Sequence, residues 1–177
     1  MERKYKIWIG QISLPAILIQ TGAGRTISGS SYEYRTEHYE TLTKLTFDSF
    51  TVLSEKSARE AVVFALNQME ANPRFFNAGM NSKLQEDGKI RVSASIMDGV
   101  KQRIAGVYNA QDVLCVSSIA DYLLEQADRN VDGTGAEIIR EKLGIEKANL
   151  VTEKQLENWK KRKEGKTGTV GAVAIDK

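Results

Sequence analysis

The sequence predicts one mixed α/β (α+β) fold, and three observations support this. Strand-like clusters of apolar residues occupy 5–20 and 90–108. Apolar residues recur at helical spacing over 57–71. The chain closes on a run of small and β-branched residues, 170–175, which is typical of a strand buried on both faces.

Composition narrows the class of protein. A chain of 177 residues with 41% hydrophobic and 27% charged residues fits one globular domain. The net charge of +2 is too small to indicate a nucleic-acid partner. One cysteine, Cys115, excludes an intramolecular disulfide and fits a reducing compartment. The early apolar runs at 7–9 and 15–19 are too short for a signal peptide or a membrane span, so we expect a cytoplasmic protein without a membrane partner.

The N-terminal third contains two weak signals for a site. Residues 5–20 predict one or two strands, and the turn that follows is Gly22-Ala23-Gly24. This Gly-x-Gly is an alternative phosphate site, but it lacks the third glycine of a dinucleotide fingerprint. The only histidine, His38, has no metal-ligand spacing around it, so we expect it on the surface. With one His and one Cys, the chain has few residues from which a Ser/His/Asp or Cys/His catalytic site could be built.

The clearest helix covers 57–71. Ser57 and Glu60 form a capping-box pattern at its start, and Asn72-Pro73 ends it. Its apolar residues fall on one face, which predicts a core-facing helix without a cofactor.

The following elements are predicted from local patterns. A hairpin turn is expected at 85–89, then a strand at 90–99 that pairs with a second strand at 103–108. Helices are expected at 117–128 and at 152–163.

Residues 128–133 have the opening pattern of an EF-hand loop, with Asp or Asn at positions 1, 3 and 5 and Gly at position 6. Position 12 is Ile139, where the loop needs a bidentate Glu. A turn between helices is favoured over calcium binding, because Thr134 and Glu137 make a second capping box for a helix that stops at Gly144.

A charged segment leads into the final strand. Residues 151–166 hold six Lys or Arg and three Glu, with Trp159 as the only aromatic residue, which favours a solvated linker over a nucleic-acid patch. Gly168 then precedes Thr169. Glycine permits a strained or sharply turned peptide bond at this point, and a threonine hydroxyl is a nucleophile when its own freed α-amine acts as the base. The alternative is a Gly-Thr pair that only opens a strand.

Three segments carry a resemblance to a known family: GTVGAVAID at 168–176, FNAG at 76–79 and SIMDG at 95–99. Their sequence and order resemble those of the plant-type L-asparaginase/isoaspartyl peptidase family, which are threonine N-terminal nucleophile (Ntn) hydrolases. The resemblance extends from about Ile17 to the end of the chain.

The resemblance implies a fold, a division of the chain and an activity. The fold is an αββα sandwich of which this chain supplies the α-subunit half. Residues 1–150 are then the α-subunit scaffold, 151–168 a charged linker, and 169–177 the first strand of the β-subunit. The implied reaction is autocatalytic cleavage between Gly168 and Thr169, followed by hydrolysis of L-asparagine and β-aspartyl (isoaspartyl) dipeptides with Thr169 as nucleophile.

The resemblance also implies the surroundings of the nucleophile. Asn77 and Gly79 belong to an active-site loop. No organic cofactor is implied, but a structural sodium ion is, held by the backbone carbonyls of Phe76, Ala78 and Met80, with Glu70 nearby. The implied partners are a small-molecule substrate, the chain's own β-subunit segment and an (αβ)2 assembly.

Several residues depart from the family pattern. Gln20 and Thr21 replace a His-Gly pair, and Ser93 stands where an Asp is usual. Only eight residues follow Thr169, whereas the family places its substrate-gripping residues and oxyanion donors beyond the nucleophile. The alternative function is therefore a truncated, non-catalytic remnant or interaction module. In either case we expect an incomplete sheet with unpaired edges, which favours association.

Overall fold

The computed structural model describes residues 11, 13–21, 30–160 and 170–176. In chain order its elements are β1 (Ala16–Gln20), α1 (Tyr32–Glu55), α2 (Ala58–Glu70), the 3-10 turn η2 (Gly79–Asn81), β2 (Val92–Asp98), β3 (Arg103–Ala110), α3 (Val116–Leu123), β4 (Asn130–Val131), α4 (Gly133–Lys142), α5 (Glu153–Lys160) and β5 (Gly171–Ile175). The prediction of a mixed helix and sheet fold is confirmed.

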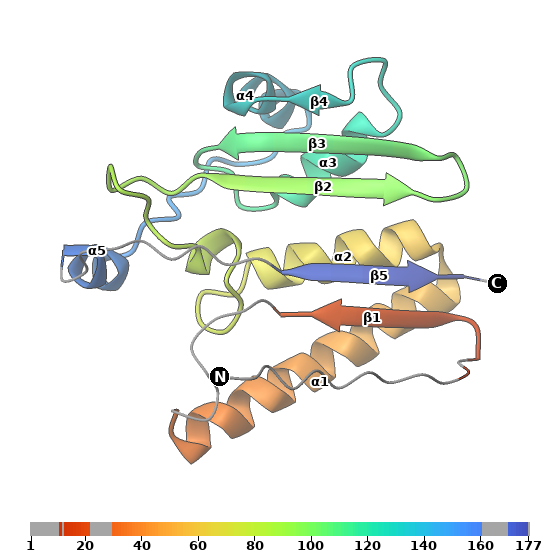
Figure 1. Ribbon diagram of the computed structural model, residues 1–177, viewed down its shortest axis with the longest axis horizontal. Coiled ribbons are helices and arrows are strands. Elements are labelled where there is room, and N and C mark those ends of the chain that lie inside the picture. Colours follow the sequence, from red (N-terminus) through yellow and green to blue (C-terminus); the bar gives the residue numbers. More distant parts are fainter. Residues whose placement is uncertain (1–10, 12, 22–29, 161–169, 177) are drawn as a thin grey trace, which may run out of the picture.

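The strands form two small sheets. In the first, β1 and β5 pair antiparallel, with Leu18 opposite Val173. In the second, β2 and β3 form an antiparallel hairpin and the short β4 adds in parallel to β3. Figure 1 shows the two sheets side by side in one layer, with α1, α2 and α3 on the same side behind them. Residues 5–10 of the first predicted strand region lie outside the described residues.

The hairpin between β2 and β3 turns on Asp98. Its carboxylate accepts hydrogen bonds from the backbone N–H groups of Val100 and Lys101, each at 2.9 Å. An Asp side chain that bonds the backbone two or three residues on is a standard way to close a turn. The predicted pairing of the two strands is therefore confirmed.

Helix α2 forms as its sequence predicts. The Ser57 hydroxyl accepts from the N–H of Glu60, and the Glu60 carboxylate accepts from the N–H of Ser57. This capping box satisfies two N–H groups that have no partner inside the helix. The inward face is fully covered, with Ala61, Ala65 and Met69 at 0% exposure.

Helix α1 has no counterpart among the predicted elements. Seven of its 24 residues are Ser or Thr, and the hydroxyls of five of these donate to backbone carbonyls one turn back, as that of Ser49 does to Leu45. The prediction that His38, on this helix, lies on the surface is wrong. His38 is only 8% exposed, and its ring stacks on that of Phe75 with 5.3 Å between centroids. Burial lowers the pKa of this imidazole, which favours its neutral form.

Other boundaries differ by a few residues from those predicted. Helix α3 ends at Leu123, before the predicted 128. The N-cap of α4 is Asp132, whose carboxylate accepts from the N–H of Gly135, so the capping box predicted for Thr134 and Glu137 is wrong. The predicted stop at Gly144 is confirmed by its left-handed φ of 66°. The turn predicted at 85–89 is present, but no β-strand flanks it directly.

Each sheet is covered on one face and bare on the other. On the first sheet, Ile19 packs against Leu45 and Met69 of the helices, while Leu18 is 68% exposed. In β5, Val173 and Ile175 are 61% and 51% exposed. The prediction that this strand is buried on both faces is therefore wrong for this structure, because helices cover one side only (Figure 1).

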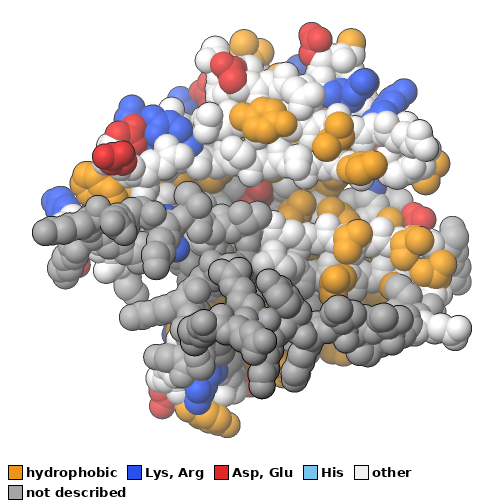
Figure 2. All heavy atoms as spheres, viewed as in Figure 1, with side chains coloured by type: hydrophobic (Ala, Val, Ile, Leu, Met, Phe, Trp, Pro, Cys, Tyr) orange, Lys and Arg blue, Asp and Glu red, His pale blue; other side chains and the backbone are white. Residues whose placement is uncertain are grey.

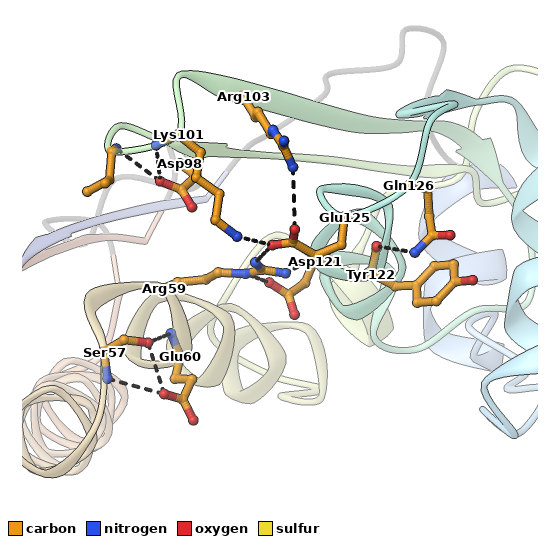
Figure 3. Close-up of polar contacts among 11 residues, drawn as sticks. Ser57, Arg59, Glu60, Asp98, Lys101, Arg103, Asp121, Tyr122, Glu125 and Gln126 are labelled. Carbon is orange, nitrogen blue, oxygen red and sulfur yellow. Dashed lines mark hydrogen bonds and ion pairs between the residues drawn. The ribbon is translucent and has the colours of Figure 1, made fainter.

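The two sheets are separate, but the helices behind them contact one another. Arg59 of α2 donates to the carboxylates of Asp121 and Glu125, each at 2.5 Å, and to the carbonyl of Asp121 (Figure 3). Glu125 also accepts from Lys101 of the β2–β3 turn at 2.7 Å. These contacts tie α2 to the region of α3 and the hairpin. Within the described part of the chain, no helix is long and apolar enough to cross a membrane.

Candidate active site

The predicted nucleophile and cleavage site, Thr169 and Gly168, lie outside the described residues. The next residue, Val170, is described and packs against the cluster formed by Leu45, Met69 and Phe76. Phe76 is 1% exposed and belongs to the predicted active-site loop. The structure thus brings the beginning of β5 and the Phe76–Met80 loop together, although 94 positions separate Phe76 from Val170 in the sequence.

An open groove of about 1300 Å³ runs between the two sheets. The hollow crosses the face shown in Figure 2. One end is lined by Glu70, the loop residues Asn77, Ala78 and Gly79, and by Val170 and Gly171. Both predicted active-site loop residues therefore line the same cavity as the first described residues after Thr169.

The backbone conformation and the close packing at position 79 require a glycine. Its φ is +51°, in the left-handed region that favours glycine. A Cβ at this position would lie 2.0 Å from the carbonyl oxygen of Glu70 at the end of α2. No residue with a side chain fits without moving this backbone, so Gly79 sets how closely the loop approaches α2.

Asn77 contributes a buried amide. Its Nδ2 is inaccessible to solvent and has no hydrogen-bond partner among the described residues. A buried donor without a partner is costly, and such groups in native proteins call for an explanation such as a functional role or a missing partner. Asn77 also lines the groove, as Val170 does.

Glu70 is the acidic group at this end of the groove. It is 5% exposed, and burial raises the pKa of its carboxyl to about 8, although hydrogen bonds from the hydroxyl and N–H of Ser117 oppose the rise. Burial of Cys115 itself, with the Glu70 charge as a smaller cause, raises the pKa of its thiol to about 11. Cys115 is therefore a thiol at neutral pH and not a thiolate nucleophile.

The predicted sodium ligands have suitable chemistry. Backbone carbonyl oxygens are ligands that hard cations accept. The Ala78 carbonyl accepts one hydrogen bond from the N–H of Asn81, and the Met80 carbonyl accepts one from Nε2 of Gln155. Each of these oxygens keeps a second lone pair. The Glu70 carbonyl, directed at Gly79, adds a further oxygen to this loop. The donor set fits a monovalent hard cation.

Two of the positions that depart from the family pattern also lie here. Gln20 pairs with Gly171 across the β1–β5 ladder, at the first residue of β5. Ser93 lines the groove, and its hydroxyl accepts from the N–H of Asn109 at 3.1 Å. Thr21, the third such position, is half-buried directly after β1.

Sequence reasoning missed Ser117 as the partner of Glu70. The two residues are 47 positions apart, and Ser117 lies in the first turn of α3 with no local motif around it. The Ser117 hydroxyl also contacts the side chain of Asn67, at 2.7 Å. No signal in a single sequence indicates such a pair, because it depends on how α2 and α3 pack.

Comparisons of the sequence with known proteins identify its family. The sequence profile of the asparaginase family matches residues 13–177. An isoaspartyl peptidase/L-asparaginase of Nostoc sp. is 31% identical over 184 residues, an alignment that covers 92% of this chain and 57% of the relative. The protein of the same name from Rattus norvegicus is 32% identical over 178 residues, covering 90% and 51%. A plant-type L-asparaginase of Pyrococcus horikoshii is 34% identical over 116 residues, covering 63% and 37%.

The structure defines a mixed helix and sheet protein in which the loop at 76–80 lies beside the start of β5. The chain belongs to the asparaginase family, because the profile covers nearly its whole length. The chain spans about half the length of the curated relatives that it matches over most of its own length.

Proposed function

We propose that the chain is the α-subunit portion of a self-cleaving hydrolase that acts on L-asparagine and β-aspartyl dipeptides. Residues 1–150 are its scaffold and 151–168 its linker to the cleavage site. Residues 169–177 begin the β-subunit, so the fold is one half of an αββα sandwich. The complete enzyme is a cytoplasmic (αβ)2 assembly.

Thr169 carries the chemistry in this proposal. In maturation its hydroxyl oxygen attacks the carbonyl carbon of Gly168, the Gly168–Thr169 amide bond breaks, and an ester forms. Water hydrolyses the ester, which leaves a Gly168 carboxylate and a free α-amine on Thr169. In turnover this amine takes the proton of the Thr169 hydroxyl as the oxygen attacks the side-chain amide of the substrate. Ammonia or an amino acid leaves, and water releases aspartate.

The single observation that supports this proposal is the position of Val170. It packs against the cluster that contains Phe76, and it lines the same groove as Asn77 and Gly79. The names of the relatives in three organisms support the substrate class.

A structural sodium ion belongs to the same proposal. The carbonyls of Phe76, Ala78 and Met80 hold it, and it fixes the backbone of the loop. It takes no part in bond breaking. The ion is therefore expected to show in the stability of the protein and not only in its activity.

The test compares three forms of the native protein: wild type, Thr169→Ala and the nearby Thr167→Ala. Intact mass and N-terminal sequencing should find a subunit that starts at Thr169 in wild type and in Thr167→Ala, but a single uncleaved chain in Thr169→Ala. Ammonia release from L-asparagine should follow the same division. Equal cleavage and activity in all three forms would refute the role of Thr169.

A further inference from the structure

Helix α5 lies in the segment that leads to the proposed cleavage site, and it is docked on the rest of the chain. The helix has eight residues, whereas an isolated helix shorter than about 12–15 residues is marginal in water. Its apolar side chains, Leu156 and Trp159, pack against the hydrophobic cluster that contains Ile96 and Leu150. Contacts with the body of the protein therefore hold α5 in place.

The side-chain amide of Gln155 joins the start of α5 to the loop at 80–82. Its Nε2 donates to the backbone carbonyls of Met80, at 3.1 Å, and Ser82, at 2.7 Å. Its Oε1 accepts from the N–H of Thr152 at 2.7 Å, and the Thr152 hydroxyl accepts from the N–H of Gln155. This reciprocal pair is a capping box. One side chain thus both caps α5 and binds it to the loop.

Trp159 holds the other end of α5. Its indole Nε1 donates to the carbonyl of Gln85 at 2.8 Å. The ring lies against Gly88, where a Cβ would come within 3.4 Å of it. Gln85 and Gly88 belong to the turn before β2, which closes with hydrogen bonds between Gln85 and both Gly88 and Lys89. Figure 1 shows α5 beside this part of the chain.

The docked helix shortens the span of chain that leads to β5. Lys160, the last residue of α5, and the packed Val170 are ten positions apart. The last fully buried residue before α5 is Leu150, 1% exposed, which lies twenty positions before Val170. A chain between two held points adopts more conformations the longer it is, and the share that meets one geometry falls roughly as the −3/2 power of length. Release of α5 doubles the span and so reduces that share about threefold.

We propose that Gln155 and Trp159 are positioning residues for self-cleavage. By docking α5 they limit the conformations of the chain that leads to Gly168, and so they raise the rate at which the Thr169 hydroxyl attacks the Gly168 carbonyl. The inference rests on the proposed function, which places cleavage at this bond. Neither residue touches the reacting atoms. Once the bond is cut, α5 and Thr169 lie on different chains, so the anchor acts on maturation and not on turnover.

Two amide-to-acid variants of the native protein test the anchor. Gln155→Glu keeps the acceptor that caps α5, but it loses the donor to Met80 and Ser82 and directs a carboxylate at their carbonyl oxygens. Asn158→Asp makes the same chemical change at an exposed position of the same helix and is the matched control. Intact mass after cell-free synthesis follows the subunit that starts at Thr169. We expect it to form roughly threefold more slowly in Gln155→Glu, and at the wild-type rate in Asn158→Asp.

Hydrogen exchange of the α5 amides measures the docking itself. Exchange should be at least roughly 10-fold faster in Gln155→Glu than in wild type, because an undocked helix of this length opens readily, and unchanged in Asn158→Asp.

Variants of Trp159 separate maturation from turnover. Trp159→Ala should slow cleavage as Gln155→Glu does, and Trp159→Phe, which keeps a packed ring without the N–H donor, should recover part of the rate. Once cleavage is complete, neither variant should change kcat or KM for L-asparagine, whereas a general structural defect lowers both the cleavage rate and kcat.

An insertion tests whether the length of the span matters. Ten Gly and Ser residues placed after Gly165 double the distance in sequence between Lys160 and Val170 without changing α5. Cleavage should slow roughly threefold, while exchange in α5 stays at the wild-type rate.

Four results overturn the proposal. The first is equal cleavage rates in Gln155→Glu and Asn158→Asp when wild type is cleaved. The second is unchanged exchange of α5 in Gln155→Glu, which means that Gln155 does not hold the helix. The third is an equal loss of cleavage rate and kcat in Trp159→Ala, and the fourth is wild-type cleavage with the insertion. Absence of cleavage in wild type overturns the proposed function as well, so the two failures are distinguishable.

Discussion

Replacing Gly79 with alanine tests the close approach of the loop to α2. Gly79→Ala places a residue with a side chain at φ +51°, which costs about 1–2 kcal/mol. Its Cβ would also lie 2.0 Å from the Glu70 carbonyl oxygen, and because that oxygen belongs to the backbone of α2, the loop must move. Forced repacking of this kind costs about 1–3 kcal/mol more, so we expect a total loss of about 2–5 kcal/mol in the free energy of unfolding.

The matched control is Gly144→Ala. Gly144 also has a left-handed φ, +66°, but a Cβ there meets no atom within 4 Å. Its cost is the backbone term alone, about 1–2 kcal/mol. Urea unfolding followed by circular dichroism measures both variants. The reasoning fails if Gly79→Ala is no more destabilising than Gly144→Ala, because the contact with Glu70 would then cost nothing.

Three further outcomes are expected. Because the folded state keeps a proton on Glu70 between its ordinary pKa of 4.5 and about 8, the stability that this carboxyl contributes is complete below that interval and is lost as pH rises through it. The difference between the unfolding free energies at pH 5 and at pH 8 should therefore be smaller in Glu70→Gln than in wild type. The reduction should be at most about 1.4 kcal/mol per pH unit. Arg59→Ala should lower the free energy of unfolding by about 1–3 kcal/mol, since it removes hydrogen bonds to two carboxylates, whereas Lys44→Ala, which removes an exposed pair with Asp48, should cost under about 0.5 kcal/mol. Replacing sodium chloride with choline chloride at equal ionic strength should lower the thermal midpoint, and an unchanged midpoint contradicts the sodium site.

Local patterns predicted those elements whose stabilising contacts are also local. The Ser57–Glu60 capping box and the stop at Gly144 involve residues within a few positions of each other, and both are present. Helix α1 was not predicted, because its Ser and Thr residues have weak helix propensity in isolation. Packing against β1 and α2 makes up for this. His38 is buried on this helix and contacts the rings of Phe75 and Phe76, in the loop after α2.

In the candidate site, too, local patterns predicted some residues and missed those that depend on packing. The Asn77–Gly79 loop was recognised by its sequence motif, and the structure places it in the groove beside Val170. The pair of Glu70 and Ser117 depends on the contact between α2 and α3, which no local pattern records. Residues of a site that lie on different elements become visible only when the packing of those elements is known.

The wrong prediction for β5 bears on the incomplete sheet. Its residue types, Val and Ile alternating with Ala, suit a strand covered on both faces, yet Val173 and Ile175 are more than half exposed. Leu18, which pairs with Val173, and Met97, on the other sheet, are also more than half exposed. Figure 2 shows several hydrophobic side chains on the face in view. Large apolar side chains gathered on one face mark an interaction surface. The second sheet that the proposed αββα sandwich implies would cover this face, so the residue types of β5 suit the complete fold and not the half that this chain supplies.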